Sequence, residues 1–182
     1  MPLTREMKID LMWDKMAIND LMNSFGRALD LHDWEAYERC FCDSLEVDFQ
    51  RLTGHEPVLT SARAWTRFAE CALGRLTVHH QYSNQAVTVS GDEASSVVYM
   101  VARHLNPDNA SWNTQYGWYE NTFARCDGGF GWQIKRLRHD FQWTSGVPDI
   151  IDMNDADCQQ AMAEVFSPAN TISQHPAPGD HQ

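Results

Sequence analysis

The chain has 182 residues, enough for one domain with a sizeable core, and its formal net charge is −11. This acidic balance argues against sequence-independent nucleic-acid binding and against docking on an anionic membrane, because both need a basic patch. No apolar run approaches the roughly 20 residues of a membrane span. The first residues lack the pattern of a signal peptide, which predicts a cytoplasmic protein whose five cysteines stay reduced.

The first part of the chain is predicted to be helical. Apolar residues recur every three to five positions over residues 5–29, which indicates a long helix that ends near Asp30. Asp33 stands where an N-cap belongs and predicts a short second helix over residues 34–41. An alternating strand is expected at residues 45–50.

A third helix is expected between Ser61, a predicted N-cap, and Leu76. Beyond it the period of the apolar residues changes from helical to two, and strand-like segments alternate with short turn sequences. These segments span residues 77–90, 94–105, 115–126 and 131–142. Consecutive strands on short turns imply an antiparallel meander, and helices followed by a sheet predict an α+β fold.

The sequence suggests one domain with a C-terminal extension. The domain is expected to cover residues 1–145. Residues 146–166 form a further segment, in which 154–166 has the pattern of a helix that closes over the sheet. Prolines and polar residues over 167–182 predict a disordered tail.

The strand beginning at residue 77 carries two adjacent histidines, His79 and His80. Side chains alternate along a strand, so the two imidazoles must point to opposite faces of the sheet. The face of His80 also carries Tyr82, Asn84, Ala86 and Thr88. Such a mixture suits a polar-lined pocket better than a plain core, and we expect His80 to face a pocket. The alternative is a structural histidine bonded to a strand carbonyl.

Asp30 lies at the C-terminal end of the predicted first helix, where the macrodipole disfavours a negative charge by about 0.3–1 kcal/mol. It is either a solvated helix end or a carboxylate held in the pocket by a histidine cation. Paired with Asp30, His80 would have a fixed tautomer and a raised basicity. It could then remove a proton from a carbon acid near neutral pH.

Several motifs resemble the SnoaL-like branch of the nuclear-transport-factor-2-like (NTF2-like) superfamily. They are Leu29-Asp30-Leu31-His32-Asp33-Trp34-Glu35, Leu45-Glu46-Val47-Asp48-Phe49, the segment from His80 to Ala94, and Asp127-Gly128-Gly129-Phe130-Gly131-Trp132-Gln133-Ile134. The resemblance covers about residues 8–145. It implies a cone, in which a curved mixed sheet, mostly antiparallel, wraps around N-terminal helices and leaves a deep pocket. Such a scaffold hosts many chemistries.

Within this branch the layout is most similar to scytalone dehydratase, which uses an Asp–His dyad and a second pocket histidine. That resemblance implies catalytic roles for Asp30, His80 and His104. The two tyrosines that polarise the substrate carbonyl in that enzyme fall here at Leu29 and Phe49. The carbonyl-activating half of the site is therefore expected to be lost or moved.

Further residues are candidates for contact with substrate. Tyr82, Tyr119 and Asn121 are candidates for donating to a developing enolate. The remaining predicted substrate contacts are Phe25, Phe49, Asn84 and His139. His104 would donate a proton to a departing hydroxyl or hold the water that does so, unless it is solvated beside the following turn. His79 and His80 point to opposite faces of the sheet, which disfavours a three-histidine metal site, so we expect no bound metal. We also expect no cofactor.

Three classes of function remain. The leading hypothesis is a cofactor-independent dehydratase or isomerase, a lyase-type enzyme that acts on a small hydrophobic cyclic substrate by Asp–His general acid–base chemistry. The alternatives are a non-catalytic small-molecule-binding protein and the trimer-forming small subunit of an aromatic-ring-hydroxylating dioxygenase. By resemblance we also expect a homo-oligomer, a trimer in preference to a dimer.

Overall fold

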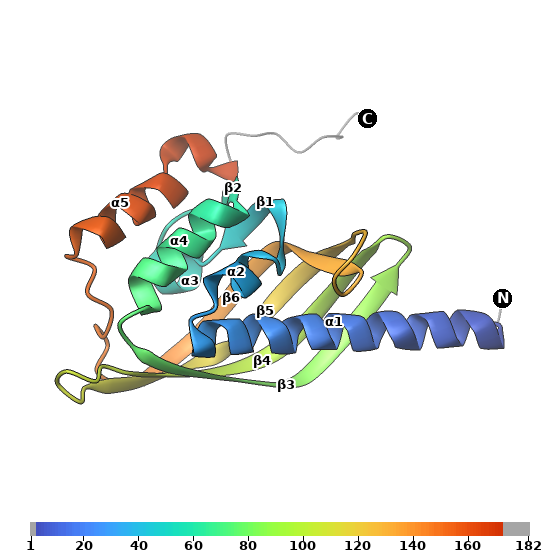
Figure 1. Ribbon diagram of the computed structural model, residues 1–182, viewed down its shortest axis with the longest axis horizontal. Helices are drawn as coiled ribbons and strands as arrows, with labels where there is room; N and C mark the ends of the chain where they lie inside the picture. The colour runs from blue at the N-terminus through green and yellow to red at the C-terminus, as the bar shows by residue number, and fades with distance from the viewer. Residues whose placement is uncertain (1–2, 173–182) are drawn as a thin grey trace.

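The structure is a computed structural model that describes residues 3–172. As predicted, it is an α+β fold in which N-terminal helices lie against a curved, open, six-stranded mixed sheet (Figure 1). The helices are α1 (Arg5–Leu31), α2 (Trp34–Glu38), α3 (Gln50–Thr53), α4 (Ala62–Leu73), α5 (Ala156–Val165) and the 3-10 helix η1 (Pro168–Asn170). The strands are β1 (Phe41–Asp48), β2 (Val58–Ser61), β3 (Thr77–Ser90), β4 (Glu93–Leu105), β5 (Trp112–Arg125) and β6 (Trp132–Gly146).

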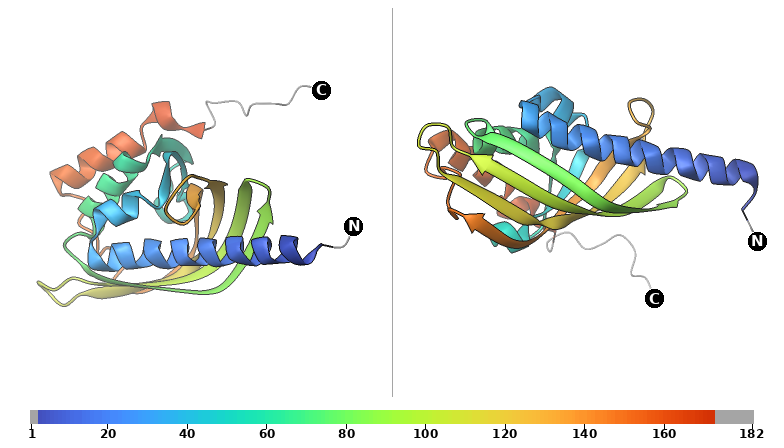
Figure 2. Two further views of the ribbon diagram at one scale, coloured as in Figure 1. Left: turned by 45° about the vertical axis from the view of Figure 1, so that its right-hand side comes forward. Right: turned by 90° about the horizontal axis from the view of Figure 1, so that it is seen from below.

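The sheet has the strand order β2-β1-β6-β5-β4-β3. Strands β3 to β6 form the predicted antiparallel meander, whereas β1 runs parallel to β6. Figure 2 shows α1 lying across the curved sheet alongside β3. This arrangement brings the C-terminal end of α1 next to the beginning of β3.

Helix α1 is only half packed. It ends at His32, which adopts a left-handed backbone conformation (φ 55) and donates its N–H to carbonyls of the last turn. The C-terminal half buries Phe25 and its neighbours against the core. The N-terminal half extends past the sheet (Figure 1), and Met12 and Trp13 are exposed there. The apolar period predicts the helix, but only its second half contributes to the core.

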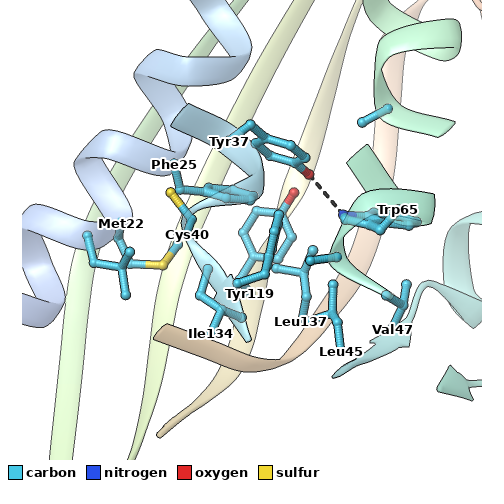
Figure 3. Packing of buried hydrophobic residues seen from close by; sticks show 14 of the residues in the cluster. Met22, Phe25, Tyr37, Cys40, Leu45, Val47, Trp65, Tyr119, Ile134 and Leu137 are labelled. Carbon is cyan, nitrogen blue, oxygen red and sulfur yellow. Dashed lines mark hydrogen bonds between the residues drawn. The ribbon is translucent and has the colours of Figure 1, made fainter. Parts of the chain in front are cut away.

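The core lies between the helices and the inner face of the sheet (Figure 3). The Phe25 ring is fully buried, with its centroid 5.3 Å from that of Tyr37, 6.0 Å from that of Phe41 and 5.7 Å from that of Tyr119. The prediction of Phe25 as a substrate contact is therefore wrong. Its ring fills the space between α1 and the sheet, outside the cavity described below.

Strand β3 contains a β-bulge that the sequence pattern does not reveal. Its register with β4 shifts just before Ala86, and Asn84 has a left-handed backbone (φ 52). The extra residue resets the alternation, so Asn84 and Ala86 are exposed while Val87 and Val89 pack against the core. The prediction that Asn84 shares the pocket face of His80 is wrong for this reason.

Other differences concern the ends of elements. Helix α2 ends at Glu38, before the predicted limit, and β1 begins early, at Phe41, where it pairs with β6. Strand β2 was not predicted. It has four residues and lies at the edge of the sheet, where its neighbouring strand is β1. Burial alternates along β2, but Leu59 is exposed and Thr60 is buried, so the apolar residues of this strand do not alternate in the sequence.

The C-terminal segment adds a second helical layer. Helix α5 falls within the segment expected to be helical, and it packs against α4 (Figure 1). Residues 167–172, predicted to be disordered, include η1 and a bridge between Val58 and Thr171, so that prediction is wrong for them. The remainder of the predicted tail, 173–182, lies outside the described residues. Within residues 3–172 no helix is long and apolar enough to cross a membrane.

Candidate active site

Asp30 and His80 meet where the end of α1 faces the start of β3. The Nδ1–H of His80 donates to Oδ1 of Asp30 over 2.7 Å. The backbone N–H of His80 donates to the same carboxylate, 2.9 and 3.1 Å from its two oxygens. The His80 side chain is 5% exposed and that of Asp30 19%. The ring and the backbone of His80 thus hold the Asp30 carboxylate in one orientation. The contact between Asp30 and His80 that the sequence predicts is present.

The position of one ring proton follows from this geometry. A carboxylate only accepts hydrogen bonds, so Nδ1 of His80 carries a proton, and in the neutral form of the ring the lone pair is on Nε2. His79 is 61% exposed, but its Nδ1 still lies 3.6 Å from Oδ2 of Asp30. Asp30 and His80 both line a cleft of about 590 Å³ along α1, and His80 also lines the interior cavity. The carboxylate thus faces a pocket, but this pocket is the outer cleft and not the interior cavity.

An interior cavity of about 360 Å³ lies on the other side of His80. Its wall is largely apolar and aromatic, with Trp65, Met100 and Ala102 among the lining residues. Such a wall suits a small hydrophobic ligand. The predicted site residues that line it are Phe49, His80, His104, Tyr119 and His139.

His104 faces this cavity as a neutral acceptor. Its Nδ1 lies 2.8 Å from Oδ1 of Asn113, whose Nδ2 donates to the carbonyl of Val147 over 3.0 Å. The amide orientation is thereby fixed, so Nδ1 of His104 must be the donor and Nε2 keeps a lone pair. Burial lowers the pKa of His104 to about 4. Of the predicted roles, this arrangement favours accepting a hydrogen bond over donating a proton.

His139, on β6, also lines the cavity but has no fixed partner. Neither of its ring nitrogens has a hydrogen-bond partner among the described residues. Its ring centroid lies 5.1 Å from those of both Phe49 and Tyr119. Burial lowers the pKa of His139 to about 4, so the ring is neutral at neutral pH.

Two predicted donors lie elsewhere. The Tyr82 ring packs against Gly26, where an added Cβ would come within 2.7 Å of it, and its buried hydroxyl has no partner among residues 3–172. Tyr82 lines the outer cleft rather than the cavity. Asn121 is buried beneath α1, where its amide donates to the sulfur of Met22 over 3.4 Å. Both side chains face inward as their strands dictate, but α1 occupies the space beside them.

Sequence reasoning missed two parts of the cavity wall. Tyr37, in α2, lines the cavity, and its hydroxyl accepts a hydrogen bond from Nε1–H of Trp65 over 2.9 Å. The C-terminal segment adds Pro148, Ile151 and Phe166 to the wall. An apolar residue in a short helix or a loop carries no sign of what it will face, so no local signal marked these residues. Among the described residues no group of three His, Cys, Asp or Glu side chains could hold a metal ion.

A curved mixed sheet packed on N-terminal helices, with a cavity at the start of β3, is the architecture of the NTF2-like class. The SnoaL-like domain profile matches residues 10–138, and the chain belongs to that family.

Three solved structures illustrate the likeness. A candidate aromatic ring hydroxylase from Novosphingobium aromaticivorans is 27% identical, with a TM-score of 0.65 over 75% of this chain and 94% of that chain. A candidate scytalone dehydratase from the same organism is 23% identical, with a TM-score of 0.62 over 73% and 87%. The hexachlorocyclohexane dehydrochlorinase LinA-type3 from Novosphingobium barchaimii is 15% identical, with a TM-score of 0.65 over 79% and 97%. The last two structures share so little sequence with this chain that their similarity shows a common fold and nothing more.

Proposed function

We propose that the protein is a cofactor-independent lyase or isomerase that removes a proton from carbon in a small, hydrophobic cyclic substrate. The observation that carries this proposal is the 2.7 Å hydrogen bond between Asp30 and the His80 ring, in the wall of an apolar cavity. Structural neighbours that bear the names of a dehydratase and a dehydrochlorinase support a lyase-type role.

The chemistry requires His80 to act as the base. Asp30 holds the proton on Nδ1, so Nε2 can accept a proton from a substrate carbon, and the carboxylate stabilises the imidazolium that forms. The electron pair of the broken C–H bond then either expels a leaving group from the neighbouring carbon or shifts a double bond. In the first case the imidazolium can return its proton to a departing hydroxyl, and in the second to another carbon.

His104 serves this reaction as an acceptor. Because its Nδ1–H is bound to Asn113, its Nε2 is the atom that can bind a substrate hydroxyl or an ordered water. The rest of the cavity excludes water and orients the substrate, which strengthens the electrostatic interactions inside it.

The test is proton exchange from carbon in deuterated buffer. A panel of bicyclic ketones is first screened for thermal stabilisation of the protein. The loss of the α-proton NMR signal of 2-tetralone and of each stabilising ketone is then followed. We expect the protein to accelerate exchange and His80→Gln, checked for folding by its melting curve, to exchange at the buffer rate. If a folded His80→Gln variant exchanged the proton as fast as the unmodified chain, His80 would be excluded as the base.

A second candidate function is favoured by the name of one neighbour, the candidate aromatic ring hydroxylase that is 27% identical to this chain. In that case the chain would be a non-catalytic subunit of a ring-hydroxylating enzyme. Such a subunit has no use for a histidine base in its cavity, so the absence of any proton exchange by the chain alone would favour this alternative.

A further inference from the structure

Two tyrosines from different elements converge on the cavity. Tyr37 is in α2 and Tyr119 is in β5, and both line its wall. In Figure 3 the hydroxyl of Tyr119 points toward the hydrogen-bonded pair of Tyr37 and Trp65. Leu29 and Phe49, which also line the cavity, have no hydroxyl to offer a ligand. Tyr37 and Tyr119 therefore supply hydroxyl donors to this part of the wall.

The Trp65 indole determines what Tyr37 can do. An indole N–H only donates, so the Tyr37 oxygen accepts from Trp65 over 2.9 Å and its own proton remains for another acceptor. The Tyr37 side chain is 2% exposed, which makes bulk water a poor candidate for that acceptor. A ligand oxygen in the cavity can fill this role.

Both hydroxyls are donors at neutral pH. Burial raises the pKa of Tyr37 well above its usual value, and the charge that Tyr119 would carry if ionised raises it further. Burial likewise raises the pKa of Tyr119. Two O–H groups that resist ionisation suit an oxygen that is neutral in the substrate and becomes negative during the reaction.

We propose that the Tyr37 and Tyr119 hydroxyls together bind the carbonyl oxygen of a cyclic ketone and stabilise it as the enolate oxygen. This inference rests on the proposed function of His80. When Nε2 of His80 takes the α-proton, the C–H electron pair becomes the enolate double bond and the carbonyl π pair moves to the oxygen. The two tyrosines donate hydrogen bonds to that oxygen throughout, and no oxidant or further reactant is needed.

The test compares a ketone with its parent hydrocarbon. Dissociation constants of 2-tetralone and tetralin are measured by calorimetry for the unmodified chain, Tyr37→Phe, Tyr119→Phe and the double variant. The control is Tyr116→Phe, because Tyr116 stacks on the exposed Trp143, with ring centroids 4.7 Å apart, and does not line the cavity. We expect each cavity substitution to weaken 2-tetralone binding about tenfold and to leave tetralin binding and the control unchanged.

Tyr119→Phe leaves the Trp65 hydrogen bond intact, so it reports on the inference even if Tyr37→Phe is destabilised. Equal losses for ketone and hydrocarbon, or a ketone bound by the unmodified chain no better than tetralin, would overturn the inference. Proton exchange of 2-tetralone is measured for the same variants, where each substitution should slow exchange by more than it weakens binding. The two proposals fail separately, since absent exchange counts against the base at His80 and absent ketone preference counts against the tyrosines.

Discussion

Strand β3 and other strands of the sheet present the same side chain to the cavity in different ways. On β3, the ring of His80 donates a hydrogen bond to the carboxylate of Asp30. On the adjacent strand β4, His104 is hydrogen-bonded to an amide, and on β6 His139 has no hydrogen-bond partner among the described residues. A carboxylate stabilises the imidazolium, whereas an amide or an apolar surrounding does not, so of these three rings His80 has the partner that favours its protonated form.

What distinguishes these histidines is the hydrogen-bond partner of each ring, more than its burial. His80 and His104 are both mostly buried, with ring centroids 6.2 Å apart. Burial alone lowers a histidine pKa, as it does for His104 and His139. Within residues 3–172, the carboxylate that is hydrogen-bonded to a cavity histidine comes from the end of α1, and it lies outside the cavity.

Removing that carboxylate should have the largest effect. Asp30→Asn can still accept from the His80 backbone N–H, but its amide can also donate to Nδ1 and favour the tautomer that has no lone pair on Nε2. We expect proton exchange to fall by about 10²–10⁴-fold. The NMR exchange assay measures this, with Asp10→Asn on the exposed half of α1 as the control. If Asp30→Asn exchanged protons at the unmodified rate, the carboxylate would not distinguish His80 from the other two histidines.

The two buried histidines without a carboxylate partner, His104 and His139, should make the fold sensitive to acid. The pKa values of His104 and His139 are about 4 in the folded state and 6.5 in an ordinary setting, so below pH 6.5 the unfolded chain binds protons that the folded chain excludes. The free energy of unfolding should hold steady above pH 6.5 and fall between pH 6.5 and 4, by up to about 3 kcal/mol for each histidine.

Urea unfolding between pH 4.5 and 7.5 measures this loss. His139→Leu should lose less stability over the same range, because it removes one of the two titrating rings and leaves that of His104 in place. If both proteins lost stability equally, His139 would not be a neutral buried ring.

The smallest effect should come from giving His104 a carboxylate partner of its own. Asn113→Asp places a negative charge beside Nδ1 of His104, and should raise the pKa of that ring from about 4 toward its ordinary value. An NMR titration of the imidazole signals measures the pKa. Asn109→Asp, in the turn between β4 and β5, serves as the matched control. An unchanged pKa in Asn113→Asp would mean that burial alone controls this histidine.

The fold and part of the site were accessible from the sequence, for identifiable reasons. The meander was predicted because apolar alternation and turn residues are local signals. The Asp30–His80 contact was predicted because the motif resemblance placed both residues. The inward position of Tyr37 and the wall from Pro148 to Phe166 depend on how distant segments pack, which no local pattern encodes. The bulge at Asn84 likewise depends on pairing with β4.

That bulge has a consequence for how the protein can vary. Because one residue is absorbed at Asn84, the part of β3 that carries His80 and the part that carries Val87 keep independent inside–outside patterns. In a strictly regular strand, turning the imidazole inward would turn Val87 and Val89 to the solvent. The bulge lets one continuous strand turn His80 to the cavity at one end and pack Val87 and Val89 against the core at the other, so residues that line the cavity can change without disturbing that packing.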